Sequence, residues 1–266
     1  MKSILVPTDQ CEFMPSAFTC ARLVARRFSA SVDGVALRPA FAEVVAPDPI
    51  VAVTIPPTDW DEAEFVKSAR QVFDANTQGA QAFRWRGGTS VEDSALGSLG
   101  RLYDLTVMCR PGGRGSRMSA FEAGLFDSGR PILMAPPVAP KSLGDSIVIH
   151  WNCSTDTARA ITYSMPFLKQ AKQVVLLTVE GSTVPGPTAR EGLGHLEQHG
   201  IRASEKTIGT TRNRTPGQTI LEEAASLGAD LLVKGAYTQS RLRQMVFGGA
   251  TNHILAKAEL PVLFSH

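Results

Sequence analysis

The residues Ser-Ile-Leu-Val-Pro-Thr-Asp at positions 3–9 return in altered form as Ser-Ile-Val-Ile-His-Trp-Asn at positions 146–152. Two further matches follow in the same order, 104–107 with 230–233 and 130–134 with 260–264. Each matched segment is a short, continuous apolar run, which is typical of a strand buried on both faces. The chain is therefore interpreted as a duplication with two similar halves.

The segments between these runs carry helical periodicity, which predicts a parallel α/β sheet in each half. In the N-terminal half we expect strands at 3–7, 31–37, 82–86, 105–109 and 131–135, with helices at 15–28, 59–78, 91–102 and 118–126. In the C-terminal half we expect strands at 146–150, 173–179, 202–207, 231–234 and 261–265, with helices at 154–170, 188–199, 215–227 and 249–257. The proline-rich stretch 136–140 is the predicted linker, which gives expected domains at 1–137 and 143–266.

The N-terminal half is longer than its counterpart before the fourth strand, and the extra residues fall most economically in 42–57. This segment is too apolar for a free loop, and its prolines at 47, 49, 56 and 57 argue against a regular element. We expect it to cover another surface. Both predicted fifth strands begin with proline and are strongly apolar, as is expected of an edge strand that needs a partner.

Composition excludes several classes of function. The 266 residues are 43% hydrophobic and 20% charged, and 27 basic against 25 acidic side chains give a net charge of +2. This balance leaves no electrostatic footprint for nucleic acid, and no apolar run approaches the roughly 18 residues of a membrane span. The apolar run near the N-terminus is too short for a signal peptide. The four cysteines form no CxxC pair. We expect a cytoplasmic protein without disulfides.

The C-terminal half carries extra residues in a glycine-bounded loop between its fourth and fifth strands. Gly235 ends a strand, while Gly248 and Gly249 begin a helix whose free N–H groups suit an anion such as phosphate. Side chains suited to contact phosphate or ribose are Lys234, Arg241, Arg243 and Thr251. The alternative is that the glycines serve only turn geometry and the arginines are solvated.

This loop resembles the nucleotide-binding motif of the universal stress protein family, Gly-x2-Gly-x9-Gly followed by Ser or Thr. Thr238 stands in place of the second glycine and Gly249 in place of the hydroxyl residue, although Thr251 follows two residues later. The run 151–154, Trp-Asn-Cys-Ser, is similar to the Trp-Asn-Gly-Ser segment of the family's tandem, two-domain bacterial members. The resemblance covers nearly the whole chain.

The resemblance implies two tandem five-stranded, Rossmann-like, adenine nucleotide alpha hydrolase-like domains. It also implies that these domains pair through their fifth strands, 131–135 and 261–265, to form an intramolecular pseudo-dimer. It also implies that the ends of strands one and two hold adenine and ribose, while the glycine loop holds the phosphates. Matched onto this chain, the expected nucleotide-binding residues are His150, Asn152, Val179, Lys234, Gly235, Tyr237, Thr238, Arg241, Arg243, Gly248, Gly249, Ala250 and Thr251. The implied ligand is ATP or another adenine nucleotide, with Mg²⁺ as an accompanying ion.

The N-terminal half lacks parts of this pattern. It keeps the family's Asp as Asp9, but Pro111 removes an N–H from a shortened loop and Met118 stands at the position of Gly248. We therefore expect no phosphate site there.

Other candidate sites are weaker. His195 and His199 have a spacing that can bind zinc but show no third ligand, and no nucleophile elbow is present, so we predict neither a metal site nor a catalytic residue. The predicted function is a nucleotide-dependent stress-response or regulatory module, with slow ATP hydrolysis and a homodimer or other protein partner left open. The alternative is a stress-related interaction protein that binds no nucleotide, which Thr238 and Gly249 favour.

Overall fold

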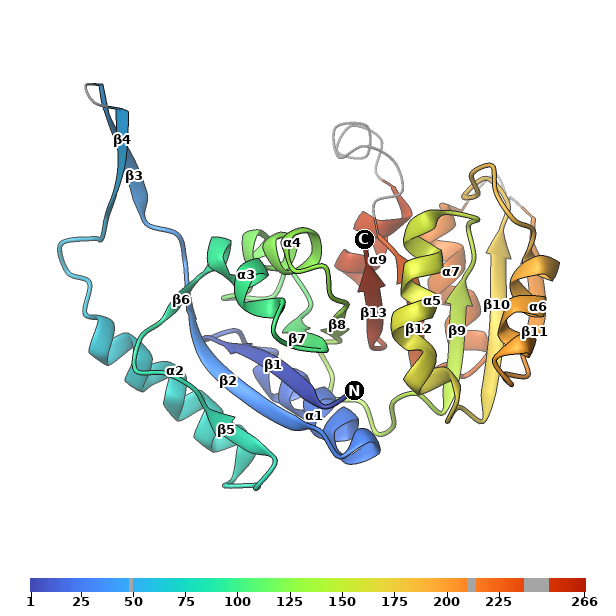
Figure 1. Ribbon diagram of the computed structural model, residues 1–266, viewed down its shortest axis with the longest axis horizontal. Coiled ribbons are helices and arrows are strands. Elements are labelled where there is room, and N and C mark those ends of the chain that lie inside the picture. Colours follow the sequence, from blue (N-terminus) through green and yellow to red (C-terminus); the bar gives the residue numbers. More distant parts are fainter. Residues whose placement is uncertain (48–49, 210–213, 237–248) are drawn as a thin grey trace.

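The computed structural model describes residues 1–47, 50–209, 214–236 and 249–266, and these are organised around one mostly parallel sheet of eleven strands (Figure 1). The strand order is β11-β10-β9-β12-β13-β8-β7-β1-β2-β5, and β6 pairs with β2 beside this path. The predicted α/β class is confirmed.

The N-terminal half contributes the strands β1 (Ser3–Thr8), β2 (Ser31–Arg38), β5 (Phe83–Trp85), β6 (Val91–Glu92), β7 (Leu105–Cys109) and β8 (Ile132–Ala135). Its helices are α1 (Met14–Phe28), α2 (Glu62–Thr77), the 3₁₀ turn η1 (Asp93–Ala95), α3 (Leu96–Gly100) and α4 (Met118–Asp127). The expected single helix over 91–102 is wrong. The segment begins with β6, which pairs with β2, and continues through the 3₁₀ turn η1, so only the five residues of α3 are α-helical.

The C-terminal half contributes β9 (Ser146–His150), β10 (Gln173–Val179), β11 (Ser204–Ile208), β12 (Leu231–Gly235) and β13 (Val262–Ser265). Its helices are α5 (Thr155–Leu168), α6 (Ala189–Gln198), α7 (Pro216–Ser226) and α9 (Ala250–Lys257). Local sequence fixes several helix starts. Ser154 caps α5, and Thr188 forms a capping box with Glu191 at the start of α6.

Each half places its own five principal strands in the order third, second, first, fourth, fifth. The order reverses between β1 and β7 in one half and between β9 and β12 in the other. In sheets of this kind the ligand crevice lies beyond the carboxyl ends of the strands at such a reversal. The topology therefore gives each half one such position, and the region beyond these strand ends is called the crevice of that half.

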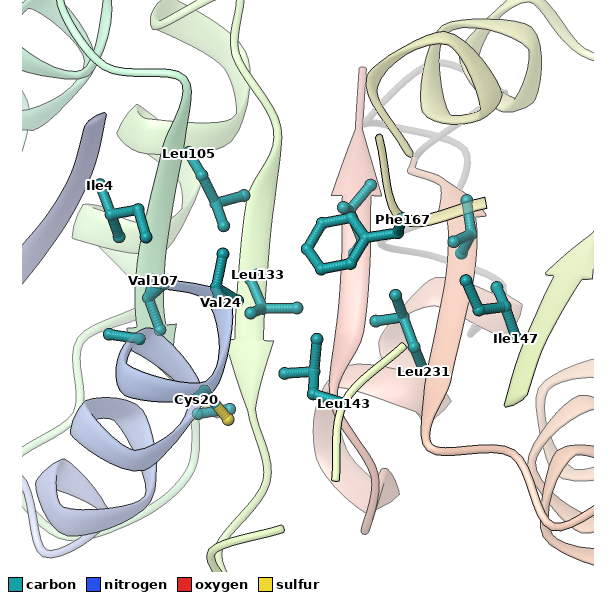
Figure 2. Packing of buried hydrophobic residues seen from close by; sticks show 14 of the residues in the cluster. Ile4, Cys20, Val24, Leu105, Val107, Leu133, Leu143, Ile147, Phe167 and Leu231 are labelled. Carbon is teal, nitrogen blue, oxygen red and sulfur yellow. The ribbon is translucent and has the colours of Figure 1, made fainter. Parts of the chain in front are cut away.

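The two halves meet where β13 pairs antiparallel with β8, and Leu263 lies opposite Leu133 with both side chains fully buried. This confirms the predicted pairing of the fifth strands. Figure 2 shows side chains of both halves, including Leu133 and Phe167, gathered in one apolar cluster across this junction. An ion pair of Arg27 with Asp145 also links the halves.

The insertion at 42–57 forms an antiparallel hairpin of β3 (Ala42–Pro47) and β4 (Ile50–Ile55), so the expectation of no regular element is wrong. The proline at 47 ends its strand, and those at 56 and 57 follow β4, so none interrupts the interior of the ladder. The proline at 49 lies outside the described residues. Figure 1 shows the hairpin projecting away from both halves, so it does not cover the C-terminal half.

Within the described ranges, none of the helices combines the length and apolar character that a membrane crossing requires. All four cysteines are free thiols.

Candidate functional site

The crevice of the C-terminal half lies at the carboxyl ends of β9 and β12, with the start of α9 beyond them. His150 ends β9 and lies beside Lys234 in the parallel register, while Thr251 lies in the first turn of α9. The structure thus brings together these three residues, which the sequence predicted as one site.

Lys234 is a buried lysine with a defined set of partners. Its Nζ donates hydrogen bonds to the Gly235 carbonyl oxygen at 2.6 Å and to Thr251 Oγ1 at 2.8 Å. Burial lowers the pKa of Lys234 to about 7, against the opposing attraction of the Asp156 carboxylate. The side chain can therefore gain or lose its charge near neutral pH.

His150 is also buried, and its Nε2 lies 3.1 Å from Ser182 Oγ. The Ser182 hydroxyl donates to the Val179 carbonyl oxygen at 2.6 Å, so its oxygen is placed to accept the Nε2 proton. His150 Nδ1 is then an acceptor, and it has no partner among the described residues. Burial and the neighbouring Lys234 lower the pKa of His150 to about 3, which keeps the ring neutral.

Asn152 has a structural task in this crevice. Its Oδ1 accepts hydrogen bonds from the Ser154 backbone N–H at 3.3 Å, Ser154 Oγ at 2.8 Å and Thr157 Oγ1 at 2.5 Å. This oxygen therefore organises the first turn of α5.

The loop that follows β10 packs on the end of β9. Val184 donates its N–H to the Asn152 carbonyl oxygen at 3.0 Å, and Trp151 Nε1 donates to the Pro187 carbonyl oxygen at 3.0 Å. A Cβ at Gly186 would lie 2.4 Å from the Cys153 carbonyl oxygen. The sequence reading missed this loop, because its path depends on these long-range contacts rather than on a local pattern.

The remaining predicted residues divide into two groups. Gly235 is required by close packing, because a Cβ there would lie 2.5 Å from the Thr157 backbone nitrogen. Gly249 is the N-cap of α9, followed by Ala250 in the first turn. The predicted residues outside the described part of the chain are Tyr237, Thr238, Arg241, Arg243 and Gly248.

The crevice of the N-terminal half is filled by Arg117, the N-cap residue of α4. Its guanidinium bonds Asp93 Oδ1 at 2.9 Å, Asp9 Oδ2 at 3.2 Å and the Leu37 carbonyl oxygen at 2.5 Å. The remaining cavity has a volume of about 20 Å³, which suits one water molecule. The two helix starts match Arg117 with Gly249, so the expected match of Met118 with Gly248 is wrong by two residues. The sequence reading therefore missed the role of Arg117, although an arginine directly before the helix was a usable signal.

The two histidines with zinc-type spacing lie at the end of α6. The rings of His195 and His199 are 4.8 Å apart and edge to face. Across the described residues, no three or more His, Cys, Asp and Glu side chains form a group suited to a metal ion.

Comparisons with known proteins agree with this fold. Residues 152–266 match the sequence profile of the Universal stress protein family. A universal stress protein from Archaeoglobus fulgidus DSM 4304 superposes with a TM-score of 0.71 at 15% identity, covering 99% of this chain and 95% of that one. A putative universal stress protein from Pseudomonas aeruginosa UCBPP-PA14 gives a TM-score of 0.55 at 15% identity, covering 100% and 93%. These two structures share the fold.

A shorter sequence match connects the chain to a protein of the stress response. The stress response protein NhaX of Bacillus subtilis (strain 168) is 38% identical over 48 residues, which are 18% of this chain and 29% of that protein. The match therefore spans less than a third of NhaX.

The fold and its crevices define a mostly parallel α/β protein whose candidate site lies at a reversal of strand order. Within that class the chain is a universal-stress-protein-like protein, and residues 152–266 carry the family's domain. The resemblance drawn from the sequence is confirmed.

Proposed function

We propose that this universal-stress-protein-like chain is a stress-response or regulatory module that binds one adenine nucleotide in the crevice of its C-terminal half. In this proposal residues 1–137 and 143–266 are two tandem domains, and only the second binds the ligand. The observation that carries the proposal is the buried amino group of Lys234, hydrogen-bonded to Thr251 at the start of α9.

Phosphate chemistry suits this arrangement. The first turn of a helix leaves backbone N–H groups without intrahelical partners, and the helix dipole adds partial positive charge there. A bound phosphate would favour the protonated, cationic form of Lys234, since a nearby negative charge raises the pKa of a buried lysine. Gly249 as the N-cap leaves the approach to these groups free of a side chain.

The crevice of the N-terminal half is already occupied by a side chain, which supports the proposal of one nucleotide site per chain. A nucleotide there would have to displace the Arg117 guanidinium and leave the buried carboxylates of Asp9 and Asp93 without their cation. Removing one partner of a buried ion pair is strongly destabilising.

ATP, ADP and AMP all satisfy this reasoning, and Mg²⁺ would accompany a di- or triphosphate through phosphate oxygens and water. The proposal assigns no protein ligand to Mg²⁺ and no catalytic residue for hydrolysis. A cytoplasmic location and a homodimer or other protein partner belong to the same proposal.

A second candidate function is an interaction protein that binds no nucleotide. The observation in its favour is the packing at the end of β9, where the Asn152 oxygen is engaged in the start of α5 and Val184 lies on its backbone. These groups would have to rearrange before they contacted adenine or ribose.

Mass spectrometry of molecules released from the purified protein, followed by calorimetry with ATP, ADP and AMP, tests the proposal. We expect one adenine nucleotide per chain and a large loss of affinity in Gly249→Asp, because the new carboxylate repels phosphate. Asp is a favoured N-cap residue, so this variant retains α9. The matched control is Met118→Asp at the exposed first residue of α4, which should bind as the parent does.

Two equivalent sites, or unchanged affinity in Gly249→Asp, would refute the proposed site. An absence of both copurified nucleotide and binding heat would favour the interaction protein.

A further inference from the structure

Three sulfur atoms converge in the crevice of the N-terminal half. Cys11 follows β1, Met14 begins α1 and Cys109 ends β7, so the reversal of strand order brings them together. All three residues line the small cavity that also contains Asp9 and Arg117. They play no part in the proposed nucleotide site, which lies in the other half.

The contacts among these side chains are close. Cys109 Sγ lies 3.5 Å from Met14 Sδ, within the range of an S–H···S hydrogen bond. The buried Cys11 lines the same cavity, and its thiol interacts with that of Cys109. The three sulfur atoms therefore form one contiguous group beside the cavity.

The C-terminal half gives an internal control for this cluster. Ile4 lies beside Leu105 as Ile147 lies beside Leu231, so the first and fourth strands have the same register in both halves. Counting from these pairs, the counterparts of Cys11, Met14 and Cys109 are Ser154, Thr157 and Gly235. Those positions also converge: Ser154 Oγ is 3.2 Å from Thr157 Oγ1, and a Cβ at Gly235 would touch the Thr157 backbone.

The same backbone arrangement therefore brings three matching positions together in each half. The C-terminal half has two hydroxyl side chains and a glycine at these positions, whereas the N-terminal half has a sulfur-containing side chain at each of them. We propose that Cys11, Met14 and Cys109 form a binding site for a soft monovalent metal ion of the Cu(I) type. Thiolate and thioether ligands select Cu(I) among the metals that proteins bind.

The donor set disfavours the commoner alternative, zinc. Structural zinc sites are closed by four Cys, His or carboxylate ligands. Here the nearest carboxylate, Asp9, already accepts from the Cys11 backbone N–H at 2.8 Å and pairs with Arg117. A three-sulfur environment without imidazole fits a three-coordinate Cu(I) ion.

Binding needs no change of oxidation state. Each cysteine sulfur that forms a bond to Cu(I) releases its thiol proton to solvent, and the Met14 thioether adds its lone pair without releasing a proton. Cys109 is only partly buried, so the cavity has a route to solvent through this residue.

The test is an anaerobic titration of the reduced, full-length protein with Cu(I) in competition with a chromogenic Cu(I) chelator. We expect one Cu(I) ion per chain, thiolate-to-copper absorption in the ultraviolet, and three sulfur neighbours by X-ray absorption. Cys11→Ser and Cys109→Gly should each abolish this binding. Both substitutions introduce the residue that the C-terminal half carries at the matching position, so the backbone frame tolerates them.

Met14→Leu conserves volume and should reduce the sulfur neighbours of copper from three to two. The matched controls are Cys153→Ser, in the other crevice, and Cys20→Ala, on α1. Cys20 is fully buried and does not line the cavity, so both controls should bind Cu(I) as the parent does.

Thermal melting verifies that each variant is folded before titration. Retention of the copper by a folded Cys11→Ser/Cys109→Gly double variant would overturn the proposal. Equal loss of copper in Cys153→Ser, or failure of the parent to compete with a weak chelator, would overturn it as well.

Discussion

The two halves of this chain have one backbone plan and two different crevices. In the N-terminal half a long side chain, Arg117, crosses from the start of α4 to the ends of β1 and β2. In the C-terminal half the matching helix start is Gly249, and the buried cation is instead Lys234 on the fourth strand. The comparison teaches that the topology determines where a crevice forms, while a few side chains decide whether a ligand can enter it.

Some features of the crevices are shared because they serve the fold. Asp9 accepts a hydrogen bond from the backbone N–H of Cys11, and Asn152 accepts one from that of Ser154. The backbone carbonyl at the end of the second strand is also satisfied internally in both halves, by Arg117 at Leu37 and by Ser182 at Val179. Groups that resemble ligand contacts in the sequence therefore have structural partners already.

The largest effect is expected at the junction that holds the two halves in one sheet. Leu263→Asp places a carboxylate opposite Leu133 in the centre of the β8–β13 pair, and we expect a loss of at least about 4 kcal/mol of stability. Thermal melts and small-angle scattering should show unfolding or separation of the halves. Leu102→Asp is the control, because Leu102 is 69% exposed. Parent-like stability and compactness in both Leu263→Asp and Leu133→Asp would contradict the junction.

The next effect concerns the guanidinium that fills the N-terminal crevice. Arg117→Met keeps the length of the side chain but leaves Asp9 and Asp93 buried without a cation, which should cost about 3 kcal/mol. Burial already raises the pKa of Asp9, and loss of Arg117 raises it further. A carboxyl whose folded pKa is raised favours the folded state at low pH, so the deficit should shrink on acidification.

Denaturant unfolding of Arg117→Met at neutral pH and near pH 4 measures this change. Arg114→Met, at an exposed position of the same loop, is the matched control and should remain within about 0.5 kcal/mol of the parent. A deficit in Arg117→Met that is independent of pH would contradict the role given to Asp9.

A third prediction exchanges a residue between the halves. Met108 is the counterpart of Lys234 in the N-terminal half, so Lys234→Met installs the other half's side chain. The pKa of Lys234 is about 7 in the folded protein, against an ordinary value of 10.5. Between pH 7 and pH 10.5 this lysine is therefore protonated in the unfolded chain and largely neutral in the folded one. Stability of the parent should therefore rise from neutral to alkaline pH, as the penalty for burying the charge disappears.

In Lys234→Met that rise should be absent, and the variant should be more stable at neutral pH by on the order of 3 kcal/mol. Urea unfolding at several pH values provides the measurement. Calorimetry of the same variant should show weaker binding of an adenine nucleotide, because the cation nearest to α9 is lost. An identical pH profile for parent and variant would exclude Lys234 as the titrating group.

A smaller effect is expected where one half has a glycine and the other has a side chain. Gly235→Ala brings a Cβ to 2.5 Å from the Thr157 nitrogen and should cost about 2 kcal/mol, since the backbone of α5 must shift. Gly194→Ala in α6 is the control, because its Cβ meets nothing within 4 Å, and it should be neutral or slightly stabilising. Chemical denaturation of the two variants compares them directly, and equal stabilities would show that β12 has room at its end.

The fold was largely predictable from local sequence because its strands are apolar runs buried on both faces. β9 and β7 have the expected bounds, and β1 extends the expected strand by a single residue. The failures arose where distant contacts decide the structure. The 91–102 segment begins as a strand because its first two residues pair with β2. The β3–β4 hairpin depends on pairing between strands rather than on the proline content of either one.

The candidate site was predictable in position but only partly in detail. Carboxyl ends of adjacent parallel strands share one edge of a sheet, so His150 and Lys234 were correctly expected together. The task of Asn152 at the start of α5, the contact of Ser182 with His150 and the reach of Arg117 depend on three-dimensional packing. No periodic pattern in the sequence encodes such contacts.

The smallest effect tests a strained turn at the matching positions Gln10 and Cys153. Cys153 has a left-handed backbone with φ of 67°, which costs a residue with a Cβ about 1 kcal/mol, whereas Gln10 is not left-handed. Cys153→Gly removes this strain from the folded state, but it also makes the unfolded chain more flexible, which opposes folding. We therefore expect a net stabilisation of about 0.5 kcal/mol. Cys153→Ala loses the thiol and keeps the Cβ, and it should show no such gain. Thermal melts of the two variants separate backbone strain from side-chain packing, and equal melting temperatures would show that the turn stores no strain.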